Sequence, residues 1–363
     1  MARPIIAQKR FESAMAAYES NLRATGRSEK TIENEDRVFK LFSGFMLEND
    51  LWDHEEGFVE IQAWRDHMVR SGRKPSTVKQ YLTVLSALYR FASSEQLGAD
   101  RWYERNPVAP LLMPDTSRSS KRPYEQLLTD EQVILLWRNS PPKRATHPEL
   151  WERNYAIVIL LLTTEIRNAE LLALTPHDLH WEDSEIVVDH GKGDKYRVVD
   201  FPLIAQTAVR MYLQSGIRPS CAKDDEPLFG TQSSKTFGAA YTKSDPWHAG
   251  SANWLSEVVR RHVRSVTGVD NIRSHDLRHV GARIDLNSGM PLEELQSKLG
   301  HESMSTTQIY SGKLTSRKSR KMTKALQEEK DRQAQRNIKR LEARGDSFFV
   351  PLLPDLIQNP VTA

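Results

Sequence analysis

The stretch LGHESMSTTQIY, from Leu299 to Tyr310, places a histidine directly after a glycine and ends on a tyrosine. A tyrosine on a polar segment means little by itself. Here it follows SHDLRH, from Ser274 to His279, and both stretches follow Arg167 in TTEIRNAELLAL. Two arginines, two histidines and one tyrosine are the groups needed to hold a phosphodiester and attack it. The combination therefore predicts a site that acts on phosphate esters.

The length and composition of the chain fit two domains with tails. Its 363 residues are 39% hydrophobic and 8% aromatic, which suffices for packed cores and exceeds the usual size of one domain. No apolar run is long enough to cross a membrane, and the first residues do not resemble a secretory signal. The single cysteine, Cys221, excludes an internal disulfide and a cysteine zinc cage. We therefore expect a soluble protein of a reducing cytoplasm or nucleoid, without a membrane partner.

The net charge does not decide whether the chain binds nucleic acid. The 51 basic and 48 acidic residues leave only +3, so any case for DNA must rest on where the charges lie. The stretch 111–126 is polar, basic and rich in serine and proline, and it cannot bury a core. It is expected to be an interdomain linker, which either crosses a phosphate backbone or is merely solvated.

The residues before this linker, 1–110, predict a helical domain. Apolar side chains recur at helical spacing, and the stretches Gly26-Arg27-Ser28 and Gly72-Arg73-Lys74-Pro75-Ser76 interrupt them. The last two helices are expected at Ile61–Val69 and Thr77–Phe91. Four helices with short connections can form a small bundle.

The residues after the linker, 127–315, predict a second domain that is mainly α with a small antiparallel β-sheet. A capped helix start at Leu128–Gln132 precedes a buried helix at Tyr155–Leu162. Two β-type runs, 184–188 and 196–200, then flank a Gly-rich turn, which is a hairpin signal. Most of the later sequence is helical again.

Two further segments are expected to lie on the surface. The stretch 219–250 is rich in Gly, Ser, Lys and Pro and predicts a long loop. Lys313–Arg344 has far more basic than acidic residues and predicts a helix too polar for a core, either solvated or docked on a partner. The apolar run Phe348–Leu353 follows it. This apolar run is expected to dock on its own domain or on a neighbouring subunit, and the whole tail, 316–363, is interpreted as a subunit-docking segment.

Breaking a phosphodiester without a metal requires three kinds of group. Cations must neutralise the charge that builds on the non-bridging oxygens, and arginine suits this because its fork pairs with two oxygens and keeps its charge. A nucleophile must lie in line with the leaving oxygen, and a tyrosine forms a recoverable covalent ester. A proton donor must reach the leaving oxygen, because an alkoxide leaves poorly.

Arg167 has an acidic neighbour on the same predicted helix face. Glu170 follows three residues later and can hold the guanidinium in place. An isolated Arg-x-x-Glu is also the pattern of an ordinary surface salt bridge. The pair is therefore informative only together with the other candidate residues.

His275, Arg278 and His279 share one predicted helix face. Histidines four residues apart can also ligate zinc, but the neighbouring sequence offers no convincing Glu or Cys ligand. A surface histidine without a special role is the remaining alternative. A catalytic pair, His275 and Arg278, is the interpretation that fits the rest of the chain.

A lysine is expected at the tip of the hairpin. Lys192 lies in the turn Gly191–Lys195, where it can reach into a groove, although Lys195 competes with it and lysines in such turns are often merely solvated. The Gly spacing is not that of a nucleotide-binding loop. His301 and Tyr310, as a lone pair, could equally be core residues.

In this order along the chain, these residues resemble the tyrosine recombinase family, the lambda-type integrases. The resemblance covers nearly the whole chain, with a helical core-binding domain first and an α+β catalytic domain second. HDLRH, LGH and TTQIY at these spacings are highly specific. The six positions that match the family's catalytic residues are Arg167, Lys192, His275, Arg278, His301 and Tyr310.

The resemblance implies a role for each position. Arg167 and Arg278 match the arginines that bind the phosphate, and His301 matches a histidine that contacts it. Lys192 matches the hairpin lysine that protonates the leaving 5′ oxygen. His275 matches the histidine that assists proton transfer. Glu170 is expected to support Arg167.

The implied reaction is site-specific recombination of duplex DNA. Tyr310 would form a 3′-phosphotyrosyl bond, and a 5′-hydroxyl of another strand would reverse the step without ATP, metal or another cofactor. The resemblance also implies a homotetramer on DNA, a monomer or dimer free of it, and possible accessory DNA-bending proteins. A type IB topoisomerase-like enzyme and an inactive DNA-binding accessory protein are the alternatives.

One position departs from the family pattern. The family often has Thr-Gly-Leu-Arg before the first arginine, whereas this chain has Thr164-Glu165-Ile166-Arg167. The carboxylate alters the local turn or has a partner elsewhere in the fold. The basic residues expected to contact DNA are Arg73, Lys74, Lys79, Arg118, Lys121, Arg122 and Lys195.

Overall fold

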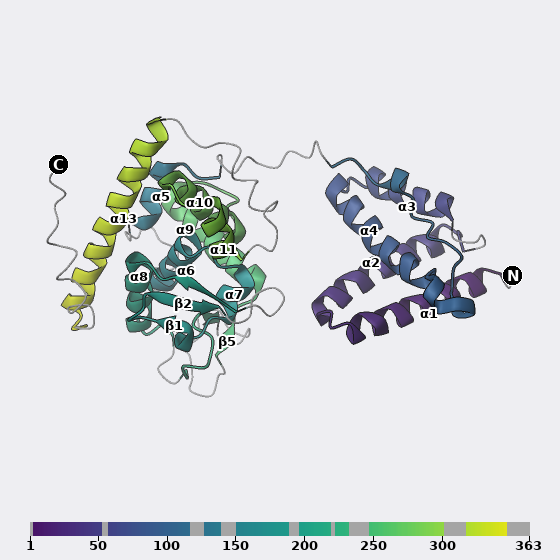
Figure 1. The fold of residues 1–363 in the computed structure, drawn as a ribbon, viewed down its shortest axis with the longest axis horizontal. Coiled ribbons are helices and arrows are strands. Elements are labelled where there is room, and N and C mark those ends of the chain that lie inside the picture. The colour runs from purple at the N-terminus through teal and green to yellow at the C-terminus, as the bar shows by residue number, and fades with distance from the viewer. Residues whose placement is uncertain are drawn as a thin grey trace. The chain divides into compact units, whose positions relative to one another are not determined.

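The computed structural model of the chain divides into two compact units, Met1–Lys121 and Arg122–Ala363 (Figure 1). Each unit is described by itself. No helix of the described part is both long enough and apolar enough to span a membrane. The structure describes residues 3–52, 57–116, 127–138, 150–188, 196–218, 222–231, 247–300 and 317–346.

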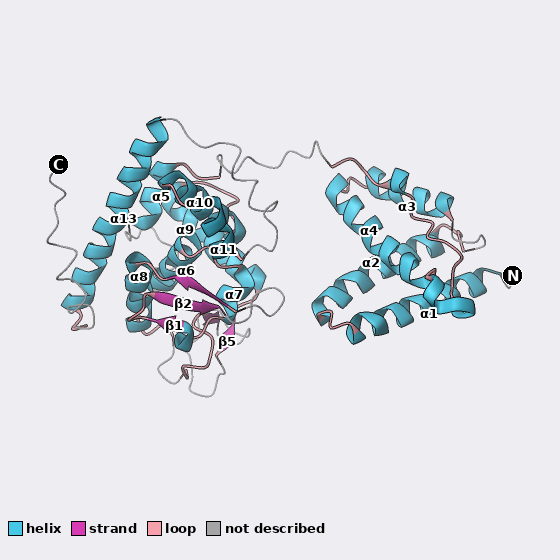
Figure 2. Ribbon diagram, in the orientation of Figure 1, coloured by secondary structure: helices cyan, strands magenta, loops and turns pink. Residues whose placement is uncertain are grey.

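The described part of unit 1 is built from α-helices, as its sequence predicts (Figure 2). Ser28 begins the second helix because its hydroxyl accepts a hydrogen bond from the Thr31 backbone N–H at 3.3 Å. The fourth begins at Pro75, whose fixed φ suits a first helical position. The helices are α1 (Arg3–Ala24), α2 (Glu29–Glu48), α3 (Phe58–Arg70) and α4 (Pro75–Ala92).

Aromatic side chains fill the core of unit 1. Phe11 of α1 is fully buried, and its ring centroid lies 5.5 Å from that of Phe42 and 5.6 Å from that of Trp52. Leu112 is buried in the same core. Because Leu112 falls within 111–126, the first residues of the expected linker belong to the packed part of unit 1.

The core of unit 2 surrounds α6 (Trp151–Thr163), which is apolar on every side and almost wholly buried. The predicted helix start before it is capped at Thr129, whose side chain and that of Gln132 each accept a backbone N–H of the other residue. The other helices of this unit are α5 (Asp130–Trp137), α7 (Asn168–Ala173), α8 (Leu203–Gln214), α9 (Ala252–Thr267), α10 (Ser274–Ser288), α11 (Leu292–Leu299) and α13 (Arg317–Ala343).

A small antiparallel sheet lies in this unit, which confirms the predicted fold class. Its order is β1 (Leu179–His180), β2 (Glu185–Val188) and β3 (Arg197–Asp200). In β2 and β3 the facing pairs run from Glu185 opposite Asp200 to Val188 opposite Arg197. Ile186 and Val199 point into the core, so this register fixes which β3 side chains face inward.

The described ends of the segment 219–250 are packed against the rest of unit 2. Leu228, Phe229 and Trp247 are buried. β4 (Gly230–Thr231) pairs antiparallel with β5 (His248–Ala249). The prediction of a plain surface loop is therefore wrong for the described ends of this segment, because apolar side chains anchor both of them.

The helix α13 packs on its own unit, against α8, α5 and α10. Asn337 is completely buried, and its side-chain amide donates to the Thr207 hydroxyl at 3.2 Å. Glu329 is buried beside Arg138, whose Nε donates to it at 3.1 Å. The prediction that this helix is too polar for a core is therefore wrong for one face, where Glu329, Gln333 and Asn337 are buried with hydrogen-bond partners. The expected docking of residues 347–363 lies outside the described residues.

Candidate active site

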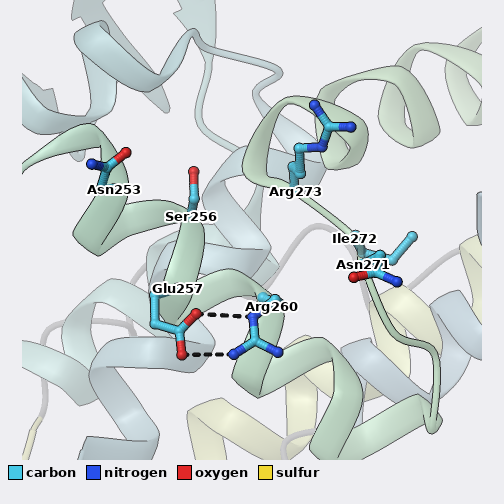
Figure 3. A pocket seen from close by; sticks show the side chains of 7 residues that line it. All are labelled: Asn253, Ser256, Glu257, Arg260, Asn271, Ile272 and Arg273. Atoms are coloured by element: carbon cyan, nitrogen blue, oxygen red, sulfur yellow. Dashed lines mark hydrogen bonds and ion pairs between the residues drawn. The ribbon is translucent and has the colours of Figure 1, made fainter. Parts of the chain in front are cut away.

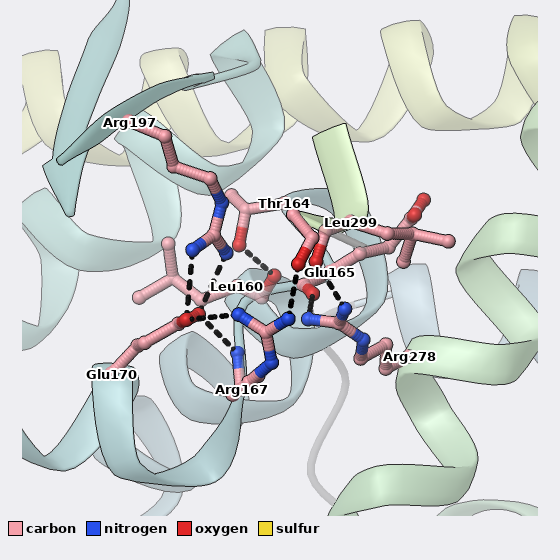
Figure 4. A network of polar contacts seen from close by, with 9 residues as sticks. Leu160, Thr164, Glu165, Arg167, Glu170, Arg197, Arg278 and Leu299 are labelled. Carbon is pink, nitrogen blue, oxygen red and sulfur yellow. Dashed lines mark hydrogen bonds and ion pairs between the residues drawn. The ribbon is translucent and has the colours of Figure 1, made fainter. Parts of the chain in front are cut away.

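Arg167 lies at a sharp turn where the buried helix α6 meets α7. The turn includes Glu165, which has a left-handed φ of +56°. Arg167 has extended backbone and is the N-cap residue of α7. Its side chain is 25% exposed, whereas that of Glu170 is 1% exposed. The turn therefore holds a reachable guanidinium above a buried carboxylate (Figure 4).

Glu170 joins two arginines. Its Oε1 accepts hydrogen bonds from Nη1 of Arg167 at 2.8 Å and from Nη1 of Arg197 at 2.7 Å. Its Oε2 accepts from the Arg167 backbone N–H at 2.6 Å and from Nη2 of Arg197 at 2.7 Å (Figure 4). The expected support of Arg167 by Glu170 is thus present, and a second arginine shares it.

This bonding changes the acidity of Glu170. Burial by itself would raise its pKa, but the hydrogen bonds from Arg197 and from the Arg167 backbone N–H outweigh burial and lower the pKa to about 2. The carboxylate is therefore ionised over the whole physiological pH range. It neutralises one of the two arginine charges that meet there.

Arg278 reaches the same place from α10. Its Nη1 donates to the Glu165 carbonyl oxygen at 2.5 Å, and its Nη2 donates to the Leu299 carbonyl oxygen at 2.5 Å (Figure 4). Arg167 donates through Nη2 to the next carbonyl oxygen, that of Gly300. Two arginines far apart in the sequence are thus fixed on consecutive backbone carbonyls.

The three arginines create a strongly positive site. Burial, together with the positive charge of Arg167, lowers the pKa of Arg278 to about 10. The cations are Arg167, Arg197 and Arg278, and Glu170 is the carboxylate bonded to the first two. An oxyanion entering this site would gain charge-assisted hydrogen bonds that are already oriented.

His275 lies one turn before Arg278 on α10 and remains exposed. Partial desolvation, and then the positive charge of Arg278, lower the pKa of its imidazole below the usual value. Its ring stands edge-on to that of His279, with centroids 4.6 Å apart. A neutral imidazole can accept a proton, which suits a group that assists proton transfer.

The turn after α11 requires glycine. Gly300 has a left-handed φ of +60°, and it caps the helix with a backbone N–H bonded to the Ser297 carbonyl oxygen at 2.9 Å. A Cβ there would lie 3.2 Å from Nε of Arg197. The chain at this point therefore passes directly beside the arginine cluster.

Three of the predicted catalytic residues lie outside the described residues: Lys192, His301 and Tyr310. The described chain stops at Gly300, the residue before His301. Within the described ranges, no group of three or more His, Cys, Asp or Glu side chains is arranged to hold a metal ion. The structure brings together Arg167, Glu170 and Arg278 and leaves the other three roles as predictions.

Sequence reasoning missed three residues of this site. The sequence predicts a strand at Arg197 without linking it to Glu170, although an arginine at the start of a β-type run beside a hairpin turn is a usable signal. Lys298 and Asp285 were not singled out. Nζ of Lys298 donates to Oε1 of Glu165 at 3.1 Å and also bonds Asp285, so the partner expected for Glu165 exists.

The predicted DNA-contacting residues fall into two groups. Arg73, Lys74 and Lys79 are exposed around the start of α4. Arg73 lies over the ring of Tyr81, 6.0 Å from its centroid. The others, Arg118, Lys121, Arg122 and Lys195, lie outside the described residues.

A pocket lies between α9 and the loop that leads into α10 (Figure 3). Arg260 and Glu257 form a two-point ion pair on its wall, at 2.8 and 2.9 Å. Arg273 lines the pocket one residue before α10 begins. The remaining lining residues are Asn253, Ser256, Asn271 and Ile272.

Comparison of the sequence with known proteins gives consistent matches. Residues 128–317 match the model of the phage integrase family. Tyrosine recombinase XerC of Corynebacterium glutamicum is 30% identical over 252 residues, 69% of this chain and 72% of the relative. Tyrosine recombinase XerC of Bifidobacterium longum is 37% identical over 267 residues, 71% of this chain and 70% of the relative.

Solved structures share the fold. A Tn1549 transposon integrase in complex with circular intermediate DNA has a TM-score of 0.59 at 19% identity, covering 85% of this chain and 97% of that one. XerH recombinase bound to its difH substrate before cleavage has a TM-score of 0.56 at 19% identity, covering 82% and 81%. At these identities, the likeness establishes the architecture alone.

Proposed function

Because the chain belongs to the phage integrase family of tyrosine recombinases, we propose that it cleaves and rejoins duplex DNA through a covalent bond between Tyr310 and a 3′ phosphate. Arg167 and Arg278 bind the phosphate in this proposal, with Glu170 as support. Lys192, His275 and His301 complete the predicted set.

One observation carries the proposal: two guanidinium groups are anchored on the carbonyl oxygens of Leu299 and Gly300. These carbonyls directly precede His301 in the chain. The cations are therefore held next to the segment that supplies the proposed phosphate-contacting histidine and nucleophile. Such prior orientation is how a site stabilises the charge of a phosphoryl transition state without reorganising.

The proposed step balances without a cofactor. The Tyr310 oxygen forms a bond to phosphorus and loses its proton, with His275 assisting that transfer. The bond from phosphorus to the 5′ oxygen breaks, and Lys192 supplies a proton to the departing oxygen. A 5′-hydroxyl from another strand then attacks the phosphotyrosyl ester and releases the tyrosine, so the number of phosphodiester bonds is unchanged.

The two units are proposed to hold duplex DNA together. The proposed boundaries are 1–110 for the core-binding domain, 111–126 for a linker along the backbone, and 127–315 for the catalytic domain. The N-terminus of α4, with exposed Arg73 and Lys74, offers backbone N–H groups and charge to a phosphate. Contacts of this kind are salt-sensitive and position the duplex without reading its sequence.

The pocket at α9 is proposed to meet the DNA beside the cleavage site. Its Asn253, Ser256 and Arg273 side chains offer donors to a base edge or a phosphate. Arg273 directly precedes α10, which carries Arg278. A contact at this pocket would therefore lie close to the reacting phosphate.

Strand exchange between two sites is proposed to involve four copies of the chain, with residues 347–363 as the docking segment. The helix α13 already packs on its own unit. The proposed contact between subunits therefore rests on the residues that follow this helix. Accessory DNA-bending proteins are proposed as further partners.

The test uses nicked suicide duplexes that tile the DNA flanking the gene. The wild-type chain is expected to form a covalent protein–DNA adduct, and Tyr310→Phe is expected to form none. Arg167→Ala should reduce adduct formation by a factor of about 10² or more, because it removes a charge-assisted contact to the phosphate. An adduct that persists in Tyr310→Phe would contradict the proposal, and recombinant junctions would distinguish strand exchange from mere relaxation.

A further inference from the structure

A glutamate occupies a position where the backbone favours glycine. Glu165 has a φ of +56° and no exposed surface. A left-handed conformation is unfavourable for a residue with a Cβ, and burying a carboxyl group adds to that cost. Interactions that Glu165 makes must therefore offset a strained backbone and a desolvated side chain.

Those interactions come from α11 and α10. Lys298 is 10% exposed at its side chain, and it bonds Glu165 and Asp285 together. Burial lowers the pKa of Lys298, but the two carboxyl groups outweigh it and leave the pKa raised. Burial raises the pKa of Glu165 to about 8. Burial thus favours the protonated form of Glu165, while Asp285 gives Lys298 a second carboxyl partner.

α10 also approaches Glu165 closely. A Cβ at Gly281 would lie 2.4 Å from the Leu162 carbonyl oxygen and 2.8 Å from Cγ of Glu165. Glycine there lets α10 lie directly on the end of α6 and on the Glu165 side chain. Arg278 is one turn earlier on α10, so its distance from the turn depends on this contact.

The same two segments hold Arg278. One of its two carbonyl partners is that of Glu165 itself, and the other is that of Leu299, the residue after Lys298. The Lys298–Glu165 contact therefore links the two chain segments whose carbonyl oxygens accept from Arg278. If the contact is lost, the two acceptors of Arg278 can move apart independently.

We propose that Glu165 and Lys298 are positioning residues for Arg278: their side-chain contact ties the turn before Arg167 to the end of α11 and so fixes the two carbonyl oxygens that orient the guanidinium. Asp285 assists by holding Lys298 against α10. This inference rests on the proposed role of Arg278 in binding the phosphate. Neither side chain touches the DNA in this proposal.

The first experiment measures single-turnover adduct formation by the full-length chain at saturating nicked DNA. Lys298→Met and Glu165→Leu keep the volume but lose the contact, and each should slow adduct formation about 10- to 100-fold, because small displacements of a catalytic group cost rates of that order. DNA affinity should change less than about threefold, since most contacts to the duplex are made elsewhere. The double variant should be no slower than the slower single variant, because both remove one contact.

Two conservative variants separate positioning from folding. Glu165→Gln keeps a neutral acceptor for Lys298 and should retain the wild-type rate within about threefold at pH 7. Glu152→Gln alters a partly exposed ion pair with Arg344 in the same unit and should have no effect. Above pH 8 the wild-type rate should change as Glu165 ionises beside Lys298, Asp285, Arg278 and the nearby Lys330 of α13, relative to a Glu165→Gln profile that lacks this transition.

A second measurement does not depend on DNA. The Nε–Hε resonance of Arg278, assigned with Arg278→Lys, should shift or broaden in Lys298→Met and stay unchanged in Glu152→Gln. If the wild type forms no adduct, the proposed function fails, and this resonance alone decides the inference. Wild-type adduct rates in folded Lys298→Met and Glu165→Leu, or an unchanged resonance in Lys298→Met, would overturn it.

Discussion

Two carboxyl groups stand on either side of Arg167, and they have opposite acidities. Glu170 receives four hydrogen bonds from two arginines and a backbone N–H, and its pKa falls to about 2. Lys298 bonds one oxygen of Glu165, no residue of the described ranges bonds the other, and burial raises the pKa of Glu165 to about 8. Burial raises the pKa of both carboxyl groups, and only at Glu170 do the hydrogen bonds outweigh it, so the two pKa values move in opposite directions.

The two carboxyl groups perform different tasks in the site. The Glu170 side supplies a fixed negative charge that holds two cations together. The Glu165 side supplies a link between backbone segments, and burial favours its protonated form. Arg278 is held on this second side by the carbonyl oxygens of Glu165 and Leu299.

Removing the Glu170 carboxylate should have the largest effect on stability. Glu170→Ala leaves Arg167 and Arg197 together without their shared counterion, and we expect the free energy of unfolding to fall by about 3–5 kcal/mol. Urea unfolding followed by circular dichroism measures this. Glu170→Gln keeps one acceptor oxygen and should lower the free energy of unfolding by less. Equal unfolding midpoints for Glu170→Ala and wild type would contradict the role of Glu170 as a shared counterion.

Protonation of Glu165 should be detectable in the pH dependence of the free energy of unfolding. The folded-state pKa of Glu165, about 8, lies above its unfolded value of 4.5, so its contribution is full below pH 4.5 and is lost as pH rises to about 8. Glu165→Gln should abolish this loss, which amounts to a few kcal/mol. Unfolding measured at several pH values between 4.5 and 9 tests it; parallel wild-type and variant curves would show that Glu165 is ionised throughout.

Glu170 should govern the acid end of the curve of stability against pH. Its folded-state pKa lies below 4.5, so its contribution is present above pH 4.5 and is lost as pH falls toward 2. Arg197→Met removes two of its hydrogen bonds and should shift this acid limb to higher pH. Acid titration of the two proteins, followed by fluorescence, measures the shift, and coincident acid limbs would argue against the Arg197 fork.

Adding a methyl group at Gly281 should have the smallest effect on stability. Gly281→Ala would place a Cβ too close to the Leu162 carbonyl and to Glu165, and we expect a loss of about 1–3 kcal/mol. Gly44→Ala is a matched control, since a Cβ there meets nothing within 4 Å, and it should stabilise by roughly 0.5–1 kcal/mol. Thermal melts of both variants give the contrast, and a harmless Gly281→Ala would mean that α10 can move away from Glu165.

The sequence predicts what is local in this site. Glu170 is three residues from Arg167, and His275 and Arg278 share a helix face, so spacing alone finds these pairs. The hairpin strands follow from two β-type runs around a Gly-rich turn. These features depend on contacts between near neighbours in the chain.

The parts that could not be predicted depend on packing between distant segments. Lys298 reaches Glu165 because α11 folds back on the α6 turn, and nothing in either segment alone indicates that meeting. The polar composition of α13 gives no sign of its buried face, because Asn337 and Glu329 are buried through partners on α8 and at the C-cap of α5. Composition measures polarity but cannot show that polar groups satisfy one another.

The two residues of the Lys298–Glu165 contact do not depend on each other equally. Lys298 keeps Asp285 as a partner when residue 165 has no side chain. Glu165 without Lys298 is a buried carboxyl group on a residue of positive φ that has lost its lysine. Glycine at position 165 should therefore cost less than loss of the lysine at position 298.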